Sequence, residues 1–185
     1  MKNLIFIGIV TTSLCCMAQN NISNKNPNLL IRLSTNNNVI NYYKSQENYK
    51  QASIESLKQK KNNQNIIEAF QENYSLSEVY FFYSNQSKNI INKKLDSLFS
   101  YDGLPLSKQK IETIKKEEYL IGYFGLTKSN LKFHAFILND NKLNPLQRPN
   151  IRFIRTYRSM GPFKRKEKKV ISILEKKIKF KNLRK

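Results

Sequence analysis

Two neighbouring stretches, 119–126 (YLIGYFGL) and 131–138 (LKFHAFIL), decide the fold class of this chain. Both are rich in the aromatic and β-branched residues that favour strands, and the polar stretch 127–130 (TKSN) separates them. Two such runs joined by four turn residues are typical of a β-hairpin. Alternation along the second run places His134, the only histidine, on the same face as Lys132 and Phe136.

Two further runs extend this hairpin into a sheet of about four strands. Residues 79–83 (VYFFY) form a continuous aromatic run, as expected of a strand buried on both faces. Residues 151–158 alternate in the manner of a half-buried strand. Three of the four runs are adjacent late in the chain. The order therefore predicts an α+β fold, with an antiparallel or mixed sheet and helices packed on one face.

Segments with helical periodicity lie before, between and after these runs. Residues 47–61 and 64–74 each carry an apolar stripe and predict two helices, with Asn62 and Asn63 as the break between them. Ser87 and Ser107 are candidate N-caps of two more helices. A last helix is predicted from about 162 to 180, with apolar residues near one side and lysines near the other, which makes it basic and amphipathic.

The first 18 residues have the pattern of a secretory signal peptide. Lys2 precedes an uncharged apolar stretch, 4–14, of about 11 residues, which fits a signal sequence and is too short to span a bilayer. Small residues before the site place the cut after Ala18. Lipid attachment to Cys15 or Cys16 is the less favoured alternative, because Leu14 precedes the first of them. The sequence thus predicts an exported protein, with a periplasmic, outer-membrane-associated or extracellular destination.

The predicted mature chain divides into an arm and one domain. Residues 19–46 are polar and rich in asparagine, and we expect a loosely ordered arm there. Residues 47–185 form the predicted α+β domain. The only cysteines lie inside the predicted signal, so cleavage excludes disulfides, thiol catalysis and cysteine metal sites from the mature protein. With 39 % hydrophobic and 11 % aromatic residues, the chain has enough apolar surface for a core.

Positive charge gathers at the C-terminal end. The chain has a formal net charge of +20, and residues 148–185 alone hold 15 Lys and Arg against Glu167 and Glu175. Scattered lysines are consistent with compositional bias. Clustering of this kind instead indicates a surface that faces a polyanion, an anionic membrane surface or nucleic acid.

The candidate site residues follow from this charge. Arg152, Arg155 and Arg158 lie within one predicted strand, and arginine binds phosphate or carboxylate through a planar fork that lysine lacks. Tyr157 adds a ring for stacking. The predicted binding residues are Arg152, Arg155, Arg158, Lys164, Arg165, Lys168, Lys169, Lys176 and Lys179. No cofactor or metal site is predicted, since one histidine is too few for zinc and no phosphate-binding glycine loop is present.

Three functions are compatible with these observations. The favoured one is a non-enzymatic, exported binding module that contacts a polyanion or anionic surface through its basic C-terminal third. The second is a metal-independent ribonuclease or toxin-like hydrolase, for which His134 and Tyr157 are the candidate catalytic residues. The third is a structural or partner-docking protein of the cell envelope.

Overall fold

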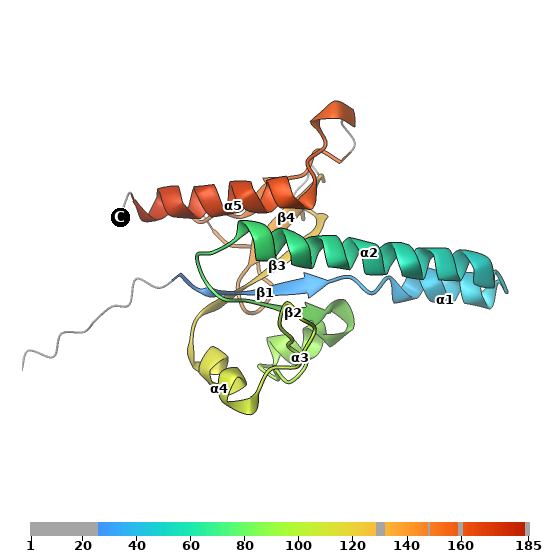
Figure 1. Ribbon diagram of the computed structural model, residues 1–185, viewed down its shortest axis with the longest axis horizontal. Coiled ribbons are helices and arrows are strands. Elements are labelled where there is room, and N and C mark those ends of the chain that lie inside the picture. The colour runs from blue at the N-terminus through green and yellow to red at the C-terminus, as the bar shows by residue number, and fades with distance from the viewer. Residues whose placement is uncertain (1–25, 129–131, 148, 159–160, 184–185) are drawn as a thin grey trace, which may run out of the picture.

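The computed structural model describes residues 26–128, 132–147, 149–158 and 161–183, and its centre is a five-stranded mixed sheet (Figure 1). The predicted signal peptide and its two cysteines lie outside these residues. The strand order is β2-β1-β3-β4-β5. The strands are β1 (Asn28–Leu33), β2 (Val79–Tyr83), β3 (Tyr119–Leu126), β4 (His134–Asn139) and β5 (Phe153–Arg155). The α+β class and the mixed sheet are confirmed, with one strand more than predicted.

Helices connect the parallel part of the sheet. β1 is parallel to both β2 and β3, whereas β3, β4 and β5 are successively antiparallel. The chain passes from β1 to β2 through α1 (Asn37–Ser45) and α2 (Tyr49–Asn73). It returns to β3 through α3 (Ser87–Ile91) and α4 (Lys108–Lys116), and ends in α5 (Glu167–Asn182). Short 3₁₀ turns occupy Ser84–Gln86 and Gly161–Phe163.

Helices cover both faces of the sheet, not one. In Figure 1, α2 and α5 lie above the sheet, and α3 and α4 lie below it. Phe70 of α2 and Leu174 of α5 belong to the core on the upper side, while Ile90 of α3 and Ile114 of α4 belong to a second core. The prediction of a single covered face was wrong. The connection from β1 to β2 and the connection from β2 to β3 cross the sheet in opposite directions. Because crossovers between parallel strands are right-handed, the helices of these two connections must lie on opposite faces of the sheet.

The segment predicted as a loosely ordered arm contains the central strand. Leu29, Leu30 and Ile31 are each at most 1 % exposed, and β1 pairs on both sides. Residues 19–25 of that segment lie outside the described residues. The run of asparagines that suggested an arm occupies the turn and the exposed start of α1. The prediction therefore failed because the asparagines follow the strand instead of interrupting it.

One continuous helix, α2, replaces the two helices expected on either side of Asn62 and Asn63. Asn63 is only 8 % exposed. Its amide nitrogen donates a hydrogen bond to the backbone carbonyl of Ser34 at 2.9 Å, and its oxygen accepts one from Gln59 at 2.9 Å. A tertiary contact thus satisfies the side chain that was expected to end the helix.

The last elements differ from prediction in their bounds. β5 has three residues instead of the eight of 151–158, and α5 begins at Glu167, later than the predicted 162. Val170, Ile171 and Leu174 are fully buried, so α5 packs on its own domain and its lysines point outward. Within the described part of the chain, no helix combines the length and apolar character that a membrane span requires.

Candidate anion-binding cleft

A cleft of about 520 Å³ opens at the carboxyl ends of β1 and β3. Arg32 and Ser34 reach it from the end of β1, and Tyr123 and Gly125 reach it from the end of β3. The connection that leaves β1 runs to the upper face of the sheet, whereas the return to β3 comes from the lower face. β1 and β3 are adjacent and parallel, and ligands of open α/β sheets generally bind at the carboxyl ends of such strands.

The long helix α2 forms one wall of the cleft. Lys58, Gln59 and Asn63 line it, and the hydrogen bonds from Gln59 to Asn63 and from Asn63 to Ser34 tie this wall to the end of β1. Because both polar side chains are buried, these bonds hold the helix at a defined distance from the strand. The position of Lys58 relative to the sheet is therefore set by the fold.

The segment between β5 and α5 forms the opposite wall. Thr156 donates a hydrogen bond from Oγ1 to the backbone carbonyl of His134 at 3.0 Å, and its own carbonyl accepts one from the Arg165 backbone N–H at 2.8 Å. The Arg165 guanidinium also lies over the Tyr157 ring, 4.6 Å from its centroid. Tyr157 has a φ of +50°, a conformation that costs a non-glycine residue about 1–3 kcal/mol. The turn that carries Arg158 is thus fixed by several contacts.

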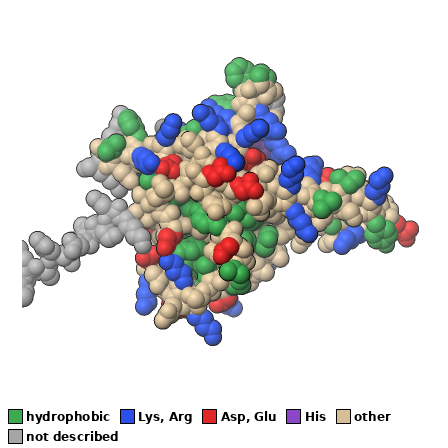
Figure 2. Space-filling view, in the orientation of Figure 1, with side chains coloured by type: hydrophobic (Ala, Val, Ile, Leu, Met, Phe, Trp, Pro, Cys, Tyr) green, Lys and Arg blue, Asp and Glu red, His purple; other side chains and the backbone are tan. Residues whose placement is uncertain are grey.

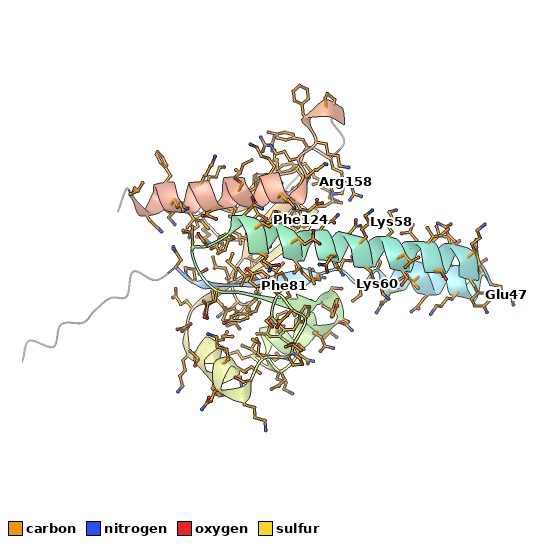
Figure 3. All side chains as sticks on the ribbon, viewed as in Figure 1. Glu47, Lys58, Lys60, Phe81, Phe124 and Arg158 are labelled. Carbon is orange, nitrogen blue, oxygen red and sulfur yellow. The ribbon has the colours of Figure 1, made fainter. Side chains whose placement is uncertain are left out.

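The cleft is strongly positive. Its basic side chains are Arg32, Lys58, Arg158, Lys164 and Arg165, and its acidic ones are Glu55 and Glu167. Lys58 lies 3.4 Å from Glu55 on the same helix, which offsets part of its charge. Figure 3 shows Lys58 and Arg158 on the same side of α2, with Lys60 on the opposite side. In Figure 2, Lys and Arg side chains gather where α5 begins and along the projecting end of α2.

Arg32 is the basic side chain most constrained by the sheet. Its guanidinium lies 5.5 Å from the centroid of the Tyr123 ring, on the neighbouring strand. Its Nε atom is buried and makes no hydrogen bond within the described residues. A guanidinium that is held against an aromatic ring and has an unsatisfied N–H can donate hydrogen bonds to an anionic ligand.

Three side chains of the cleft lining can take part in acid–base chemistry: Glu55, His134 and Glu167. His134 lies on the face of Phe136, toward α2, and Glu55 is paired with Lys58. Hydrolysis of a phosphodiester without a metal normally uses both a general base and a general acid. Among the described residues, no group of three or more His, Cys, Asp or Glu is arranged to hold a metal ion. The cleft thus combines one imidazole and two carboxylates with five basic side chains.

The structure separates the predicted site residues into three places. Arg158, Lys164, Arg165 and His134 line the cleft. Arg152 lies over Phe153 and Arg155 over Phe133, both outside the cleft lining. The lysines of α5 lie elsewhere: Lys168 pairs with Glu72 at 2.7 Å, Lys179 pairs with Glu175 at 2.5 Å, and Lys169 and Lys176 are exposed on the helix surface.

Sequence reasoning missed Arg32, Lys58 and Tyr123. Arg32 follows three apolar residues directly, and an arginine at the end of a strand was its one visible signal. That signal required β1 to be recognised as a strand. Nothing local distinguishes Lys58 from the other lysines of its helix, since only the sheet beside it defines the cleft.

The fold and the cleft together define an α+β domain with a mixed sheet and a basic crevice at the carboxyl ends of its parallel strands. Comparisons of the chain with protein-family models, with curated proteins and with solved structures give no match.

Proposed function

We propose that this protein is a non-enzymatic binding module for a polyanion or anionic surface, and that the cleft receives the anionic groups of its ligand. One observation carries the proposal. Five basic side chains from three separate parts of the chain converge on one cleft that holds only two carboxylates. Arg32 comes from β1, Lys58 from α2, and the other three from the segment before α5.

The physical argument is electrostatic. Like charges that share a cavity repel one another, and an anion bound between them removes this repulsion. Arg32, Arg158 and Arg165 each offer a planar fork that binds two oxygens of a phosphate, sulfate or carboxylate. The positive charge, which is +20 for the full sequence with only Lys2 inside the predicted signal, attracts polyanions over a longer range. Salt screens this attraction with a length of about 8 Å at physiological ionic strength.

The basic C-terminal third contributes in two ways. Arg158, Lys164 and Arg165 belong to the cleft, whereas the lysines of α5 form an outward-facing surface beside it. Each exposed lysine near an anionic surface adds on the order of 1 kcal/mol. We therefore propose that the cleft defines where the ligand binds and that α5 adds attraction without a specific geometry.

The predicted signal peptide places this binding outside the cytoplasm. The partners that fit are polyanions of the periplasm, the outer membrane or the extracellular space. Mass measurement of the exported protein tests both the cut after Ala18 and the lipoprotein alternative. A chain that begins at Gln19 supports the proposal, and a diacylglyceryl group on Cys15 or Cys16 supports the alternative.

Heparin binding tests the cleft with matched variants. The double variant Lys58→Ala, Arg158→Ala removes two cleft cations, and Lys60→Ala removes a lysine on the opposite side of the same helix (Figure 3). Each ion contact with a polyanion contributes about 0.7–0.9 to the slope of log K against log salt. We expect the double variant to lose about 1.5 in this slope, with Lys60→Ala near the parent.

The outcome that contradicts the proposal is equally defined. If the double variant and Lys60→Ala bind heparin alike while circular dichroism shows both to be folded, the cleft is not the binding site. If the unsubstituted protein itself releases heparin at low salt, its basic side chains are only solvated and do not form a binding site.

The hydrolase alternative is favoured by a single observation, the position of His134 in the same cleft as Arg32 and Arg158. A ribonuclease of this kind degrades single-stranded RNA in the presence of a metal chelator, and His134→Gln abolishes that activity. RNA that stays intact at micromolar protein excludes the alternative.

The partner-docking alternative is favoured by the hairpin of α1 and α2, which projects beyond the sheet (Figure 1). α1 buries none of its residues, and five large apolar side chains of the hairpin are exposed: Val39, Tyr42, Tyr49, Ile54 and Leu57. Lysines outnumber acids along it, so the fitting partner is an acidic amphipathic helix. A photo-crosslinking residue at position 57 tests this: crosslinks to an acidic helix, lost when Tyr42→Glu is added, support docking.

A further inference from the structure

The face of β3, β4 and β5 opposite α2 and α5 carries a row of aromatic and arginine side chains. The register places Tyr123 opposite Ile137, and Ile137 opposite Phe153, so these three side chains share one face. Arg155 lies opposite Ala135 on the same face. We call the set Arg32, Tyr123, Phe133, Phe153 and Arg155 the Arg–aromatic row.

Contacts within the row are close. The Arg32 guanidinium lies 5.5 Å from the Tyr123 ring centroid, and the Arg155 guanidinium lies 4.2 Å from the Phe133 ring centroid. The rings of Phe133 and Phe153 are 5.0 Å apart in an edge-to-face arrangement. The row therefore begins and ends with an arginine that is stacked on an aromatic ring.

Phe133 is held rigidly although it precedes β4. Its backbone N–H donates to Oγ1 of Thr127 at 3.3 Å, and its carbonyl accepts from the Thr127 N–H at 3.1 Å. This pairing continues the β3–β4 ladder by one step. These bonds position the backbone, and contacts of the ring with Arg155 and Phe153 orient it, which lowers the entropy lost when a ligand stacks on it.

The row lies outside both hydrophobic cores of the described chain. Neither core includes Ala135, Ile137 or Phe153, although Ala135 and Ile137 are themselves buried. The aromatic rings lie beside these small and aliphatic side chains, and Tyr123, Phe133 and Phe153 remain half-buried. They leave part of their surface available to a ligand.

Arg32 and Tyr123 belong both to the row and to the cleft. The basic cleft and the Arg–aromatic row therefore form one continuous surface around the carboxyl end of β3. Phosphates need the cations of the cleft, and nucleic acid bases need flat apolar or guanidinium surfaces on which to stack. The cleft supplies the cations, and the adjoining Arg–aromatic row supplies the flat surfaces.

We propose that the polyanion is a single-stranded nucleic acid, with phosphates in the cleft and bases stacked on the Arg–aromatic row. This inference rests on the proposed function and narrows its ligand class. Lipid headgroups use only the cations and leave the aromatic rings without a role. A double helix keeps its bases stacked on one another, so its bases do not reach the row.

Two oligomers of equal charge separate stacking from charge. One is a thymidine oligomer of about 15 nucleotides, which covers the site sizes of single-strand binding surfaces. The other is an abasic oligomer of the same length. Base–aromatic stacking makes binding tighter by roughly five-fold or more per base, so we expect the thymidine oligomer to bind at least ten-fold more tightly at equal salt.

Two variants test whether the Arg–aromatic row causes the difference in affinity between the thymidine and abasic oligomers. Phe153→Leu keeps an apolar side chain beside Ile137 but removes the ring, and Arg155→Lys keeps the charge but removes the planar guanidinium. Phe163→Leu is the matched control, because Phe163 is 69 % exposed and lies outside the row. We expect the two row variants to lower affinity for the thymidine oligomer several-fold without changing affinity for the abasic oligomer, and the control to change neither.

The outcomes distinguish the two proposals. Equal affinity for the thymidine and abasic oligomers, with binding lost in the Lys58→Ala, Arg158→Ala variant, overturns the nucleic acid inference and leaves the cleft function standing. Binding of duplex DNA as tightly as the thymidine oligomer also overturns the inference. Failure of heparin and both oligomers to bind overturns the proposed function itself.

Discussion

Replacing Gly122 by alanine tests how tightly β3 is packed under α2. A Cβ atom at Gly122 would lie 2.5 Å from Cζ of Phe136 and 3.1 Å from Cδ1 of Ile31. Phe136 is fully buried, with its ring 5.7 Å from that of Phe70 and 5.1 Å from that of Phe124, so it has no room to move away. Overpacking of this kind costs about 1–3 kcal/mol.

A smaller opposing effect reduces this cost. Exchanging glycine for alanine stiffens the unfolded chain and stabilises the folded state by about 0.4–1 kcal/mol where the backbone permits it. The φ of Gly122 is not in the left-handed region, so its backbone permits alanine. We expect Gly122→Ala to lower the free energy of unfolding by about 1–2 kcal/mol, measured by urea denaturation with an unchanged m-value.

A double-mutant cycle identifies the clash as the cause. Phe136→Leu costs about 1–2 kcal/mol alone, a part of the cost of full truncation to alanine, and it vacates the space that the new Cβ needs. The double variant is then expected to be about as stable as Phe136→Leu alone, with a coupling energy of about 1–2 kcal/mol. Gly125→Ala is the control, since its nearest atom belongs to the half-buried ring of Tyr123.

Two results refute this reasoning. If Gly122→Ala is neutral or stabilising, the strand and Phe136 are less closely packed than the structure shows. If the two substitutions add independently, the destabilisation does not come from contact between these side chains.

Three further predictions concern stability. Asn63→Ala removes two buried side-chain hydrogen bonds and is expected to lower the free energy of unfolding by about 1–2 kcal/mol in urea; an effect below 0.5 kcal/mol, an order-of-magnitude limit for surface sites, contradicts its tertiary role. Burial, and for Tyr80 also its hydrogen bond to a carboxylate, raises the pKa of Tyr80 and of Tyr101 from 10.0 to about 12. The unfolded chain releases these protons first, so stability is full below pH 10 and falls as the pH rises toward about 12; urea titrations that give a constant free energy across this interval refute the assignment. Lys168→Ala breaks an ion pair whose two side chains are each 52 % exposed, and it is expected to leave the free energy of unfolding in urea nearly unchanged, so a clear loss shows a packing role for the lysine stem.

The strands with the strongest local signal were predicted closely. β2 and β3 have the predicted bounds, because aromatic and β-branched residues are frequent in both runs and favour strands. β4 begins three residues later than predicted, although Phe133 still pairs with Thr127. β5 is shorter because Tyr157 adopts a left-handed conformation that ends the ladder, which residue type does not reveal.

β1 and α2 were misjudged for a common reason. Asparagine favours loops, yet Asn28 is the first residue of β1, Asn36 only follows the strand, and Asn63 is buried within α2. A polar side chain ends a helix only if it finds its hydrogen bonds locally. Here the backbone of Ser34, 29 residues away in sequence, supplies the partner.

In the candidate site, too, the sequence predicted some residues and missed others. The sequence alone placed the clustered charge in the C-terminal third and drew attention to Arg158, Lys164, Arg165 and His134, because charge is a property of composition. It also combined Arg152, Arg155 and Arg158 into one set.

The tertiary structure separated that set and joined other residues to it. Arg158 lies in the cleft with Arg32 and Lys58, whereas Arg155 lies on Phe133, outside the cleft lining. The local pattern determined the α+β class, the hairpin and the basic C-terminal end, because periodicity and charge are carried by neighbouring residues. The strand order, the two covered faces and the cleft depend on contacts between residues far apart in the chain, and only the packing of β1 between β2 and β3 decided them.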